Sequence, residues 1–531
     1  MSAPAADAVL PPGLSATEWA NALRAFASAL GEDAVLTAEQ AAEFRDPYSY
    51  PGWDDHWPSA VVQPASTDEV QAVVRVARQY KIPLWTTSMG KNNAYGGPAP
   101  RVRGSVVVSM RRLNRVLEVN EELAYAVVEP GVSFFDLCAE LQRRGSTLWA
   151  SIPDLGWGSV IGNTVDHGVG YLPGGNHAES MCGMEVVLAS GEVIRTGMGA
   201  MAGNHAWHAH RKGFGPAVDS LFMQSNFGIV TKAGKWLTPR PEVYMPVGVS
   251  TPNEADLEAV IDTMRPLMLD GTVRNVPLLG TVTGAASMIK PRAAWHPGDG
   301  PLPGTFFRQV MDETGLGFWN LRLALYGAEP VVDAQLDVIR AAFSRVPAAT
   351  VTARKVPGDE VSEETVIEHP ERVQGGVPGM ALLDSLQWWG GVGGHLDFSP
   401  VVPLQGSHVR RLMRMLRPEF ERAGLDFWLG CVLTPRSCLC VCPILFDTTN
   451  EQQVRAAFDL YGQLVKLTGE AGYGLYRGHV AFMDDIAAQY AFNGHAMRRL
   501  YGTLKDALDP DGILSPGKQG IWPRSARPDP S

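Results

Sequence analysis

Two glycine-rich segments in the first third of the chain contain residue types suited to binding a phosphate group. The first, SMGKNNAYGG, spans residues 88–97, and the second, IPDLGWGSVIGNTVDHGVGY, spans residues 152–171. Glycine and asparagine adopt positive φ readily, so such segments can turn several backbone amides toward one anion. One such segment alone is a weak signal, because neither matches the Rossmann or phosphate-loop pattern. Two of them in one region favour a long ligand with two charged groups, such as a dinucleotide, without indicating which one.

The six cysteines are a second group that could do chemistry, and four of them fall between Cys431 and Cys442. Six cysteines in so long a chain do not make a disulfide framework, so we expect reduced thiols. Cys438, Cys440 and Cys442 alternate with other residues, a period of two that places their sulfurs on one face of a strand. Zinc sites usually contain Cys-x-x-Cys pairs, which this cluster lacks. We therefore predict buried structural thiols and no metal site.

Strand and helix patterns surround the first glycine-rich segment. A strand is predicted from residue 60 (AVVQP), followed by a helix capped at Ser66 with Glu69 three residues later, and by a strand over IPLWTTS. Strands at GSVVVSM and AYAVVEPG, a helix at FFDLCAELQRRG and a hairpin turning near Ser190 and Gly191 follow. A last strand ends near Pro239, where we expect a first lobe to close.

Length and composition limit the class of protein. The chain has 531 residues, with 45 basic and 56 acidic side chains and a net charge of −11. It is long for one core, so we expect two closely packed lobes. The charge is spread along the chain, and we expect no nucleic-acid partner. No stretch approaches the roughly 18 apolar residues of a membrane span, and MSAPAADAVLPPG lacks the features of a signal peptide, so we expect a cytoplasmic protein without a membrane anchor.

Four segments resemble, in the same order, the family of vanillyl-alcohol oxidase, eugenol oxidase and 4-cresol dehydrogenase. They are IPLWTTSMGKNNAYGGPAPRVRGSVVVSM, PDLGWGSVIGNTVDHGVGY, GEVIRTGMGAM and the ending DALDPDGILSPGKQGIW. The resemblance implies an α+β, two-lobed flavoprotein of the vanillyl-alcohol oxidase fold, with a PCMH-type FAD-binding domain and an α+β cap. We expect an N-terminal segment over 1–56, the FAD-binding domain over 57–242, the cap over 243–499 and a C-terminal segment over 500–531 that completes the FAD-binding domain.

The resemblance also implies a binding site for a para-substituted phenol. Tyr95, Tyr476 and Arg477 match the trio that binds the phenolic oxygen in this family. A phenol has a pKa of about 10, so a buried guanidinium and two hydroxyl donors would favour its anion at neutral pH. The anion would push electron density toward the para carbon. Hydride could then leave the attached benzylic carbon for the flavin, which would give a quinone methide.

The same resemblance implies that three further residues lie around the flavin. Asp154 matches a carboxylate near the reactive flavin nitrogen, which assists flavin reduction and guides water to the quinone methide. Lys518 matches a basic residue at the pyrimidine edge, where negative charge gathers on reduction. Ser399 matches a position that faces the ring from the other side.

His395 matches the histidine to which the 8-methyl group of the flavin is joined in the oxidase branch. The dehydrogenase branch uses a tyrosine slightly earlier, and this chain has Gln387 where that tyrosine aligns. We therefore predict FAD in an 8α-histidyl bond to His395, which would raise the flavin potential. His56 is the nearest candidate for a second histidine that assists the attachment.

The other expected FAD contacts come from the two glycine-rich segments, their flanks and one later strand. They are Thr87, Ser88, Gly90, Lys91, Asn92, Asn93, Pro153, Gly158, Ser159, Gly162, Asn163, Gly170, Gly228 and Ile229.

The chain departs from the family at two places. Cys438, Leu439 and Cys440 stand where the oxidases carry Met-His-His, and YLPGGNH stands where they carry Tyr-Thr-Pro-Tyr-Gly-Asp-His. Loss of bulky tyrosine and histidine side chains is expected to change the shape and polarity of the pocket. The substrate is therefore not assumed to be vanillyl alcohol or eugenol.

These features together predict an oxidase that acts on a 4-alkylphenol or a 4-hydroxybenzylic alcohol and passes electrons to dioxygen, giving hydrogen peroxide. One alternative is a dehydrogenase of the same fold that passes electrons to a cytochrome c. Another is a flavin- or aromatic-binding protein that has lost catalysis, and retention of Tyr95, Asp154, Tyr476, Arg477 and Lys518 argues against it. The habit of the family suggests a homodimer or a higher homo-oligomer.

Overall fold

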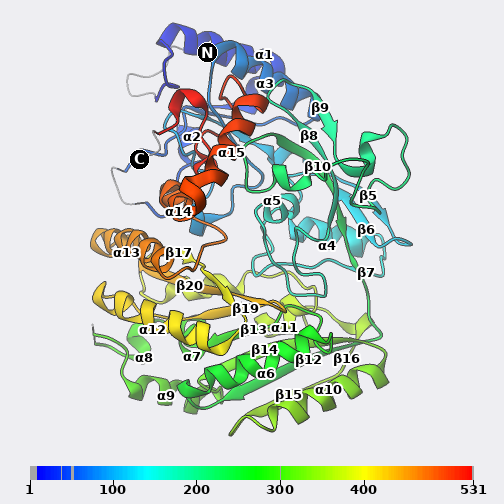
Figure 1. Cartoon of the computed structure of the whole chain (residues 1–531), viewed down its shortest axis with the longest axis vertical. Helices are drawn as coiled ribbons and strands as arrows, with labels where there is room; N and C mark the ends of the chain where they lie inside the picture. The colour runs from blue at the N-terminus through cyan, green and yellow to red at the C-terminus, as the bar shows by residue number, and fades with distance from the viewer. Residues whose placement is uncertain (1–8, 38, 50–52, 299, 529–531) are drawn as a thin grey trace.

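The computed structural model describes residues 9–528 except residues 38, 50–52 and 299. Two halves are visible in Figure 1. The blue and cyan segments of the first part of the chain lie together with the red C-terminal helices in one half. The green to orange segments form the other half. The predicted α+β architecture with two lobes is confirmed.

The first lobe begins with a four-stranded sheet in the order β1-β2-β4-β3. The strands β2 (Ala60–Val62), β4 (Val106–Ser109) and β3 (Leu84–Thr87) run parallel, and β1 (Val35–Leu36) is antiparallel to β2. The helices α1 (Ala16–Leu30) and α3 (Thr67–Tyr80) pack on this sheet. Apolar side chains of both helices and of the strands form one buried core. Ser66 caps α3 and accepts a hydrogen bond from Glu69 N. The predicted strand-helix-strand unit is therefore present, and the first glycine-rich segment follows directly from β3.

An antiparallel five-stranded sheet forms the rest of the first lobe. Its order is β5 (Val116–Asn120), β6 (Tyr125–Val128), β10 (Ile229–Trp236), β8 (Met181–Val187) and β9 (Val193–Arg195). The hairpin predicted near Ser190 and Gly191 joins β8 to β9. The predicted helix is α4 (Phe134–Arg143), and the short strands β7 (Leu148–Trp149) and β11 (Thr238–Pro239) pair with each other.

The second glycine-rich segment contains a short helix that the sequence pattern did not predict. This helix, α5 (Val160–Val165), is capped by Ser159, whose hydroxyl accepts a hydrogen bond from Gly162 N. A Cβ at residue 162 would overlap Ser88 Oγ. Glycine therefore serves here to bring the two glycine-rich segments into contact.

The second half is built on a nine-stranded sheet in the order β15-β12-β14-β13-β19-β20-β17, with β16 paired to β12 and β18 paired to β20. All its pairings are antiparallel. The strands are β12 (Val243–Thr251), β13 (Leu278–Thr281), β14 (Trp319–Gly327), β15 (Thr350–Ala353), β16 (Val356–Pro357), β17 (Gly393–Phe398), β18 (Val401–Pro403), β19 (Gly430–Leu433) and β20 (Ser437–Asp447).

Helices cover one face of this sheet and leave the other face for the first lobe. The helices α6 (Leu257–Leu269), α10 (Glu329–Phe343), α12 (Gly406–Arg422) and α13 (Glu451–Glu470) contribute to one apolar core with the sheet. On the opposite face, Leu278, Val432 and Leu439 pack against the core of the first lobe. No helix among the described residues is both long and apolar enough to span a membrane.

The C-terminal part of the chain returns to the first lobe. After α14 (Met483–Gln489) and α15 (Phe492–Leu508), Leu514 pairs in parallel with Leu84 of β3. Asn226 Nδ2 donates hydrogen bonds of 2.9 Å to the carbonyl oxygens of Ser515 and Ile521. The four boundaries given above stay a prediction, but these contacts place residues 514–521 against β3, the strand that leads into the first glycine-rich segment, and against Asn226.

Candidate active site

A cavity of about 600 Å³ lies between the two lobes. Its wall is formed by both glycine-rich segments, by the sheet face of the second half that the helices leave open, and by the C-terminal segment. Most of the site residues predicted from the sequence line it: Thr87, Ser88, Gly90, Lys91, Asn92, Tyr95, Pro153, Asp154, Gly158, Ser159, Gly162, Asn163, Gly228, Ile229, His395, Tyr476, Arg477 and Lys518.

Three of the predicted site residues do not line the cavity: Asn93, Gly170 and Ser399. Asn93 begins the short 3-10 helix η2 (Asn93–Tyr95) and lies beside Tyr48. A Cβ at Gly170 would overlap His177 and Ser151, so this glycine permits close packing. Ser399 is fully buried next to Tyr95. The roles expected for these three residues stay predictions.

Tyr95, Tyr476 and Arg477 come together from segments far apart in the sequence. The guanidinium carbon of Arg477 lies 5.8 Å from the ring centre of Tyr95 and 5.3 Å from that of Tyr476. A Cβ at Gly96 would overlap Val480, and the φ of Gly96 is +96°. This glycine therefore lets the loop that carries Tyr95 pack on the segment that carries Arg477.

The electrostatics of this trio suit an anionic oxygen. Burial raises the pKa of Tyr95 well above its ordinary value and also raises the pKa of Tyr476, so both hydroxyls stay neutral donors. Burial alone would lower the pKa of Arg477, but the acidic groups around it, led by Tyr476 and Asp166, hold that pKa above its usual value. The site therefore offers one fixed positive charge and two neutral O–H groups.

Asp166 fixes the orientation of Arg477. Arg477 Nε donates a 2.6 Å hydrogen bond to the carbonyl oxygen of Asp166 and lies 3.7 Å from its carboxylate. Gln224 Nε2 donates a 2.6 Å hydrogen bond to the carbonyl oxygen of Tyr476. Asp166 and Gln224 both belong to the first lobe. The position of the Arg477 guanidinium therefore depends on how the two lobes pack against each other.

Asp154 lies in a small network that the sequence did not reveal. The hydroxyl of Tyr171 donates a 2.5 Å hydrogen bond to Asp154 Oδ2, and Nε2 of His369 lies 3.1 Å from Oδ1. Burial raises the pKa of Tyr171 well above its ordinary value, which keeps the hydroxyl protonated. Tyr171 ends the second glycine-rich segment, whereas His369, in α11 (His369–Gln374), comes from the other lobe and has no sequence signal around it.

His395 projects from β17 into the cavity. Its side chain is 15% exposed, and Nδ1 is buried without a hydrogen-bond partner among the described residues. Burial lowers its pKa, so the imidazole is neutral and nucleophilic at neutral pH. The ring centre of Tyr48 lies 5.5 Å from that of His395. His56, the helper suggested by the sequence, is not beside it: its Nδ1 lies 2.9 Å from the carbonyl oxygen of Pro100, and it does not line the cavity.

The polar groups and the glycines of the cavity wall fit the binding of FAD. Its glycine-rich walls leave backbone close to the open space, and Gly162 has no room for a side chain. Thr87 Oγ1, Asn226 Oδ1 and His395 Nδ1 are buried polar atoms without partners in the described part of the chain. Such orphaned groups are rare unless a ligand or water satisfies them. Lys518 supplies a positive charge at one edge, with its Nζ 5.6 Å from the ring centre of Trp85.

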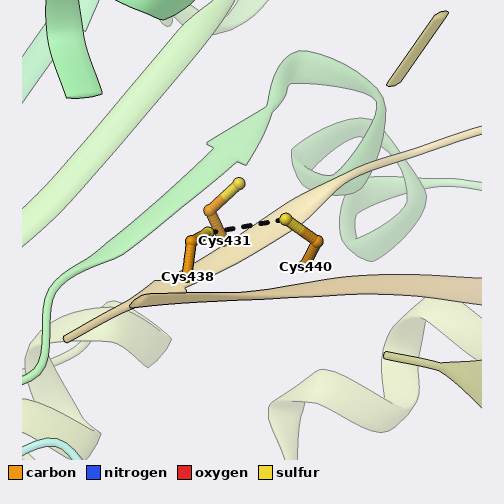
Figure 2. Close-up of side chains that lie close together, drawn as sticks. All are labelled: Cys431, Cys438 and Cys440. Carbon is orange, nitrogen blue, oxygen red and sulfur yellow. Dashed lines mark hydrogen bonds between the residues drawn. The ribbon is translucent and has the colours of Figure 1, made fainter. Parts of the chain in front are cut away.

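Figure 2 shows that three of the cysteines gather in the second half. Cys438 and Cys440 lie on one face of β20, as predicted, with Cys431 opposite Cys440 on β19. The ligand atoms of these three residues lie within 4.8 Å of one another, and all three thiols are buried in the core that the helices cover. The predicted burial of the thiols is confirmed, while the absence of a metal stays a prediction.

This arrangement also shows which of the departing residues face the cavity. Among the described residues at the two departures from the family, Leu439 and Tyr171 line the cavity, and Cys438 and Cys440 do not. The alternation of β20 points its cysteines away from the cavity. The departure at Leu439 therefore lies on the cavity wall, and the expected change in the shape and polarity of the pocket stays a prediction.

Comparisons with known proteins agree with this geometry. The family model described as "FAD binding domain" matches residues 58–197, and the model "FAD linked oxidases, C-terminal domain" matches residues 405–519. The chain is 35% identical over 519 residues to the 4-cresol dehydrogenase [hydroxylating] flavoprotein subunit of Pseudomonas putida, covering 97% of this chain and 98% of that protein. The chain belongs to the vanillyl-alcohol oxidase and 4-cresol dehydrogenase family. It is an FAD-linked oxidoreductase with a PCMH-type FAD-binding domain.

Two solved structures of this family have nearly the same fold. One is a 4-ethylphenol oxidase from Gulosibacter chungangensis in complex with isoeugenol, with a TM-score of 0.93 and 36% identity over 98% of this chain and 100% of that chain. The other is p-cresol methylhydroxylase with substrate bound, with a TM-score of 0.91 and 33% identity over 97% of this chain and 99% of that chain. The family also includes the 1'-carboxy-chondrochloren decarboxylase of Chondromyces crocatus, 31% identical over 95% of this chain and 98% of that protein.

Replacing Gly162 by alanine tests the contact between the glycine-rich segments. A methyl group at this position would overlap Ser88 Oγ and push apart the two walls of the cavity. We expect the variant to lose much of its FAD during purification, measured as the ratio of flavin to protein absorbance. Gly304→Ala is the matched control, because a Cβ there meets no atom within 4 Å. An unchanged flavin content in Gly162→Ala would contradict this assignment.

Proposed function

We propose that the enzyme oxidises para-substituted phenols that carry a 4-alkyl or 4-hydroxymethyl group. The observation that carries this proposal is the trio of Tyr95, Tyr476 and Arg477 on the wall of the FAD cavity. Two neutral hydroxyl donors and one buried cation form a site for a single anionic oxygen. A phenolate is an anion of this kind on a flat, apolar ring, and the apolar side chains of Leu439, Val441 and Leu445 line the same cavity.

Each group of residues at the site would have a separate role in the reaction. Bound FAD would accept the hydride that leaves the benzylic carbon of the substrate. Arg477 and the hydroxyls of Tyr95 and Tyr476 would hold the phenolic oxygen as an anion and fix the orientation of the ring. Asp154, held by Tyr171 and His369, would orient the water that adds to the quinone methide. The product depends on whether water adds or a proton leaves the substituent.

Dioxygen is the proposed electron acceptor, with hydrogen peroxide as the second product. The similarity to the 4-ethylphenol oxidase, 36% over 98% of this chain, supports the oxidase. The similarity to the 4-cresol dehydrogenase subunit, 35% over 97% of the chain, supports a dehydrogenase that uses a cytochrome c. Gln387, where that branch aligns a tyrosine, favours the oxidase. The family habit also leads us to propose a homodimer or a higher homo-oligomer.

We further propose that FAD is joined covalently to His395. A neutral imidazole that faces the cavity, with a buried and unpartnered Nδ1, has the properties that such a bond requires. Gln387 offers no nucleophile in its place. Burial of the ring of Tyr48 against His395 would limit the motion of the imidazole before the bond forms.

Oxygen uptake during a substrate screen tests the proposed function. The purified holoenzyme is mixed with 4-ethylphenol, 4-hydroxybenzyl alcohol and vanillyl alcohol, and oxygen consumption and peroxide are measured together. We expect peroxide in equal amount to the substrate oxidised. If the substrate is oxidised only when cytochrome c is added, the enzyme is a dehydrogenase and not an oxidase. No oxidation of any 4-alkylphenol with either acceptor would refute the function.

A further inference from the structure

The strand that carries His395 directs a second titratable side chain into the cavity. Successive side chains of a strand alternate between its faces, so His395 and Asp397 share one face of β17. Leu396 and Phe398 point the other way and are fully buried in the core of the second half. The side chain of Asp397 lines the cavity and keeps 24% of its surface accessible. No role was predicted for Asp397 from its sequence position.

Asp397 differs from the other carboxylates of the cavity in having no hydrogen bond from the described residues. The described wall contains three carboxylates, those of Asp154, Asp166 and Asp397. Asp154 is held by Tyr171 and His369, and Asp166 lies beside Arg477. The imidazole of His395, with Nε2 4.0 Å from Oδ1 of Asp397, is its one neighbour within ion-pair distance. The free oxygens of Asp397 are therefore available to a ligand.

The charged groups around Asp397 come from both lobes. Burial raises its pKa, His395 and Arg477 oppose that rise, and Asp154 adds to it. Neutral hydroxyl and thiol groups complete its surroundings, namely Tyr48, Tyr95, Tyr171, Cys442, Tyr461 and Tyr476. Two of these phenols belong to the trio that binds the phenolic oxygen. Asp397 lines the same cavity as Tyr95, Tyr476 and Arg477, and its charge acts on the pKa of all three, so a phenol bound at the trio would share this cavity with the carboxylate.

We propose that Asp397 is the base that receives the proton of the bound phenol, directly or through one water, and that this step, which rests on the proposed function, allows the enzyme to bind neutral phenols. The O–H bond of the substrate breaks, an O–H bond forms on the carboxylate, and the electron pair stays on the phenolic oxygen. No redox partner is needed for this transfer. When water adds to the quinone methide, its hydroxyl bonds to the benzylic carbon and its proton balances, with the hydride already removed, the reduction of dioxygen to hydrogen peroxide. As the product leaves, the carboxylic acid of Asp397 returns its own proton to the phenolic oxygen.

Charge balance is the physical reason for this role. The positive charge of Arg477 already faces the carboxylate of Asp166. A phenolate bound beside an ionised Asp397 would place another negative charge in a buried site, at a cost that grows as the effective dielectric constant falls. Transfer of the proton to Asp397 forms the phenolate without changing the total charge of the site. The enzyme would then suit alkylphenols, which are neutral in solution at neutral pH.

Proton counting on a ligand that cannot react tests this inference. The probe is 4-cyanophenol, because its para substituent carries no hydrogen to transfer and its anion absorbs at longer wavelength than the neutral phenol. The holoenzyme and the probe are mixed near pH 7 in a weak buffer with a pH indicator. For the wild type we expect the spectrum of the bound anion and almost no proton released to solution.

Asp397→Asn is the informative variant, since asparagine has nearly the same shape and cannot accept the proton. We expect it to release about one proton for each anion bound, and its Kd to rise about tenfold for each pH unit below the pKa of the probe. The Kd of the wild type should change little over that range. Asp397→Glu should restore the wild-type proton count, and Asp359→Asn, at an exposed position, is the neutral control.

The same proton count in Asp397→Asn and in the wild type, or a wild-type protein that releases a full proton, would overturn the inference. If Asp397→Asn loses its flavin, the wild-type count and Asp397→Glu still decide the matter. Reduction of the flavin by 4-ethylphenol tests the proposed function separately from the role of Asp397. If that reduction occurs and the proton count contradicts the role of Asp397, only the inference fails, whereas the absence of any reduction removes the proposed function.

Discussion

Replacement of Arg477 by alanine is expected to lower kcat/KM for 4-ethylphenol by a factor of at least about 10² to 10³, equal to about 3–4 kcal/mol of barrier. Arg477 is the one guanidinium close to both tyrosines of the trio in the described structure, and its charge would hold the phenolic oxygen as an anion. Without it, the site has two neutral donors and the buried carboxylates remain. The loss should appear in kcat as well as in KM, because the charge matters most when hydride leaves.

Steady-state oxygen uptake over a range of substrate concentrations measures this effect. Arg143→Ala is the control, since Arg143 lies on the exposed side of α4 and pairs with Glu140. Flavin content must be the same in both variants. Turnover within about threefold of the wild type in Arg477→Ala would show that the phenolate is not formed at this place.

Replacement of His395 by alanine is expected to convert a bound flavin that survives denaturation into one that is released. Gln387, at the position where we align the tyrosine of the dehydrogenase branch, offers no nucleophile for such a bond. We also expect turnover to fall by about tenfold or more, because loss of the bond lowers the flavin potential and so weakens the driving force for hydride transfer.

Acid precipitation followed by absorbance of the supernatant gives the answer directly. The wild type should leave its yellow colour in the pellet, and His395→Ala should leave it in solution. His205→Ala is the control, because His205 is exposed and does not line the cavity. A wild-type protein that releases its flavin on denaturation would refute the covalent bond, without affecting the noncovalent binding of FAD.

The sequence predicted the fold well where a local pattern controls local structure. The helix after Ser66 begins where the capping residues indicate, and the period of two at Cys438 and Cys440 places both thiols on one buried face of β20. The short helix α5 was not predicted, because Gly162, which lowers its helix propensity, is required for contact with Ser88 of the first segment. Tertiary packing overrides local propensity at that point.

The site was predictable only in part, because its geometry depends on contacts between the two lobes. The site residues predicted in the glycine-rich segments line the cavity, with the exceptions of Asn93 and Gly170. His369 and Asp397 have no local pattern that marks them, since each becomes part of the site through the packing of distant segments. The expected change of the pocket stays a prediction: Leu439 of the departing segment lines the cavity, whereas Cys438 and Cys440 face the core because side chains alternate along a strand.

Anaerobic reduction of the flavin by 4-ethylphenol, compared with its methyl ether 4-ethylanisole, tests the central claim most directly. Both molecules have the same benzylic carbon, but only the phenol can form an anion at Arg477, Tyr95 and Tyr476. In a stopped-flow experiment without oxygen, we predict that the phenol bleaches the flavin absorbance rapidly and that the methyl ether leaves it unchanged. Equal rates for the two molecules, or no bleaching by the phenol, would contradict the account.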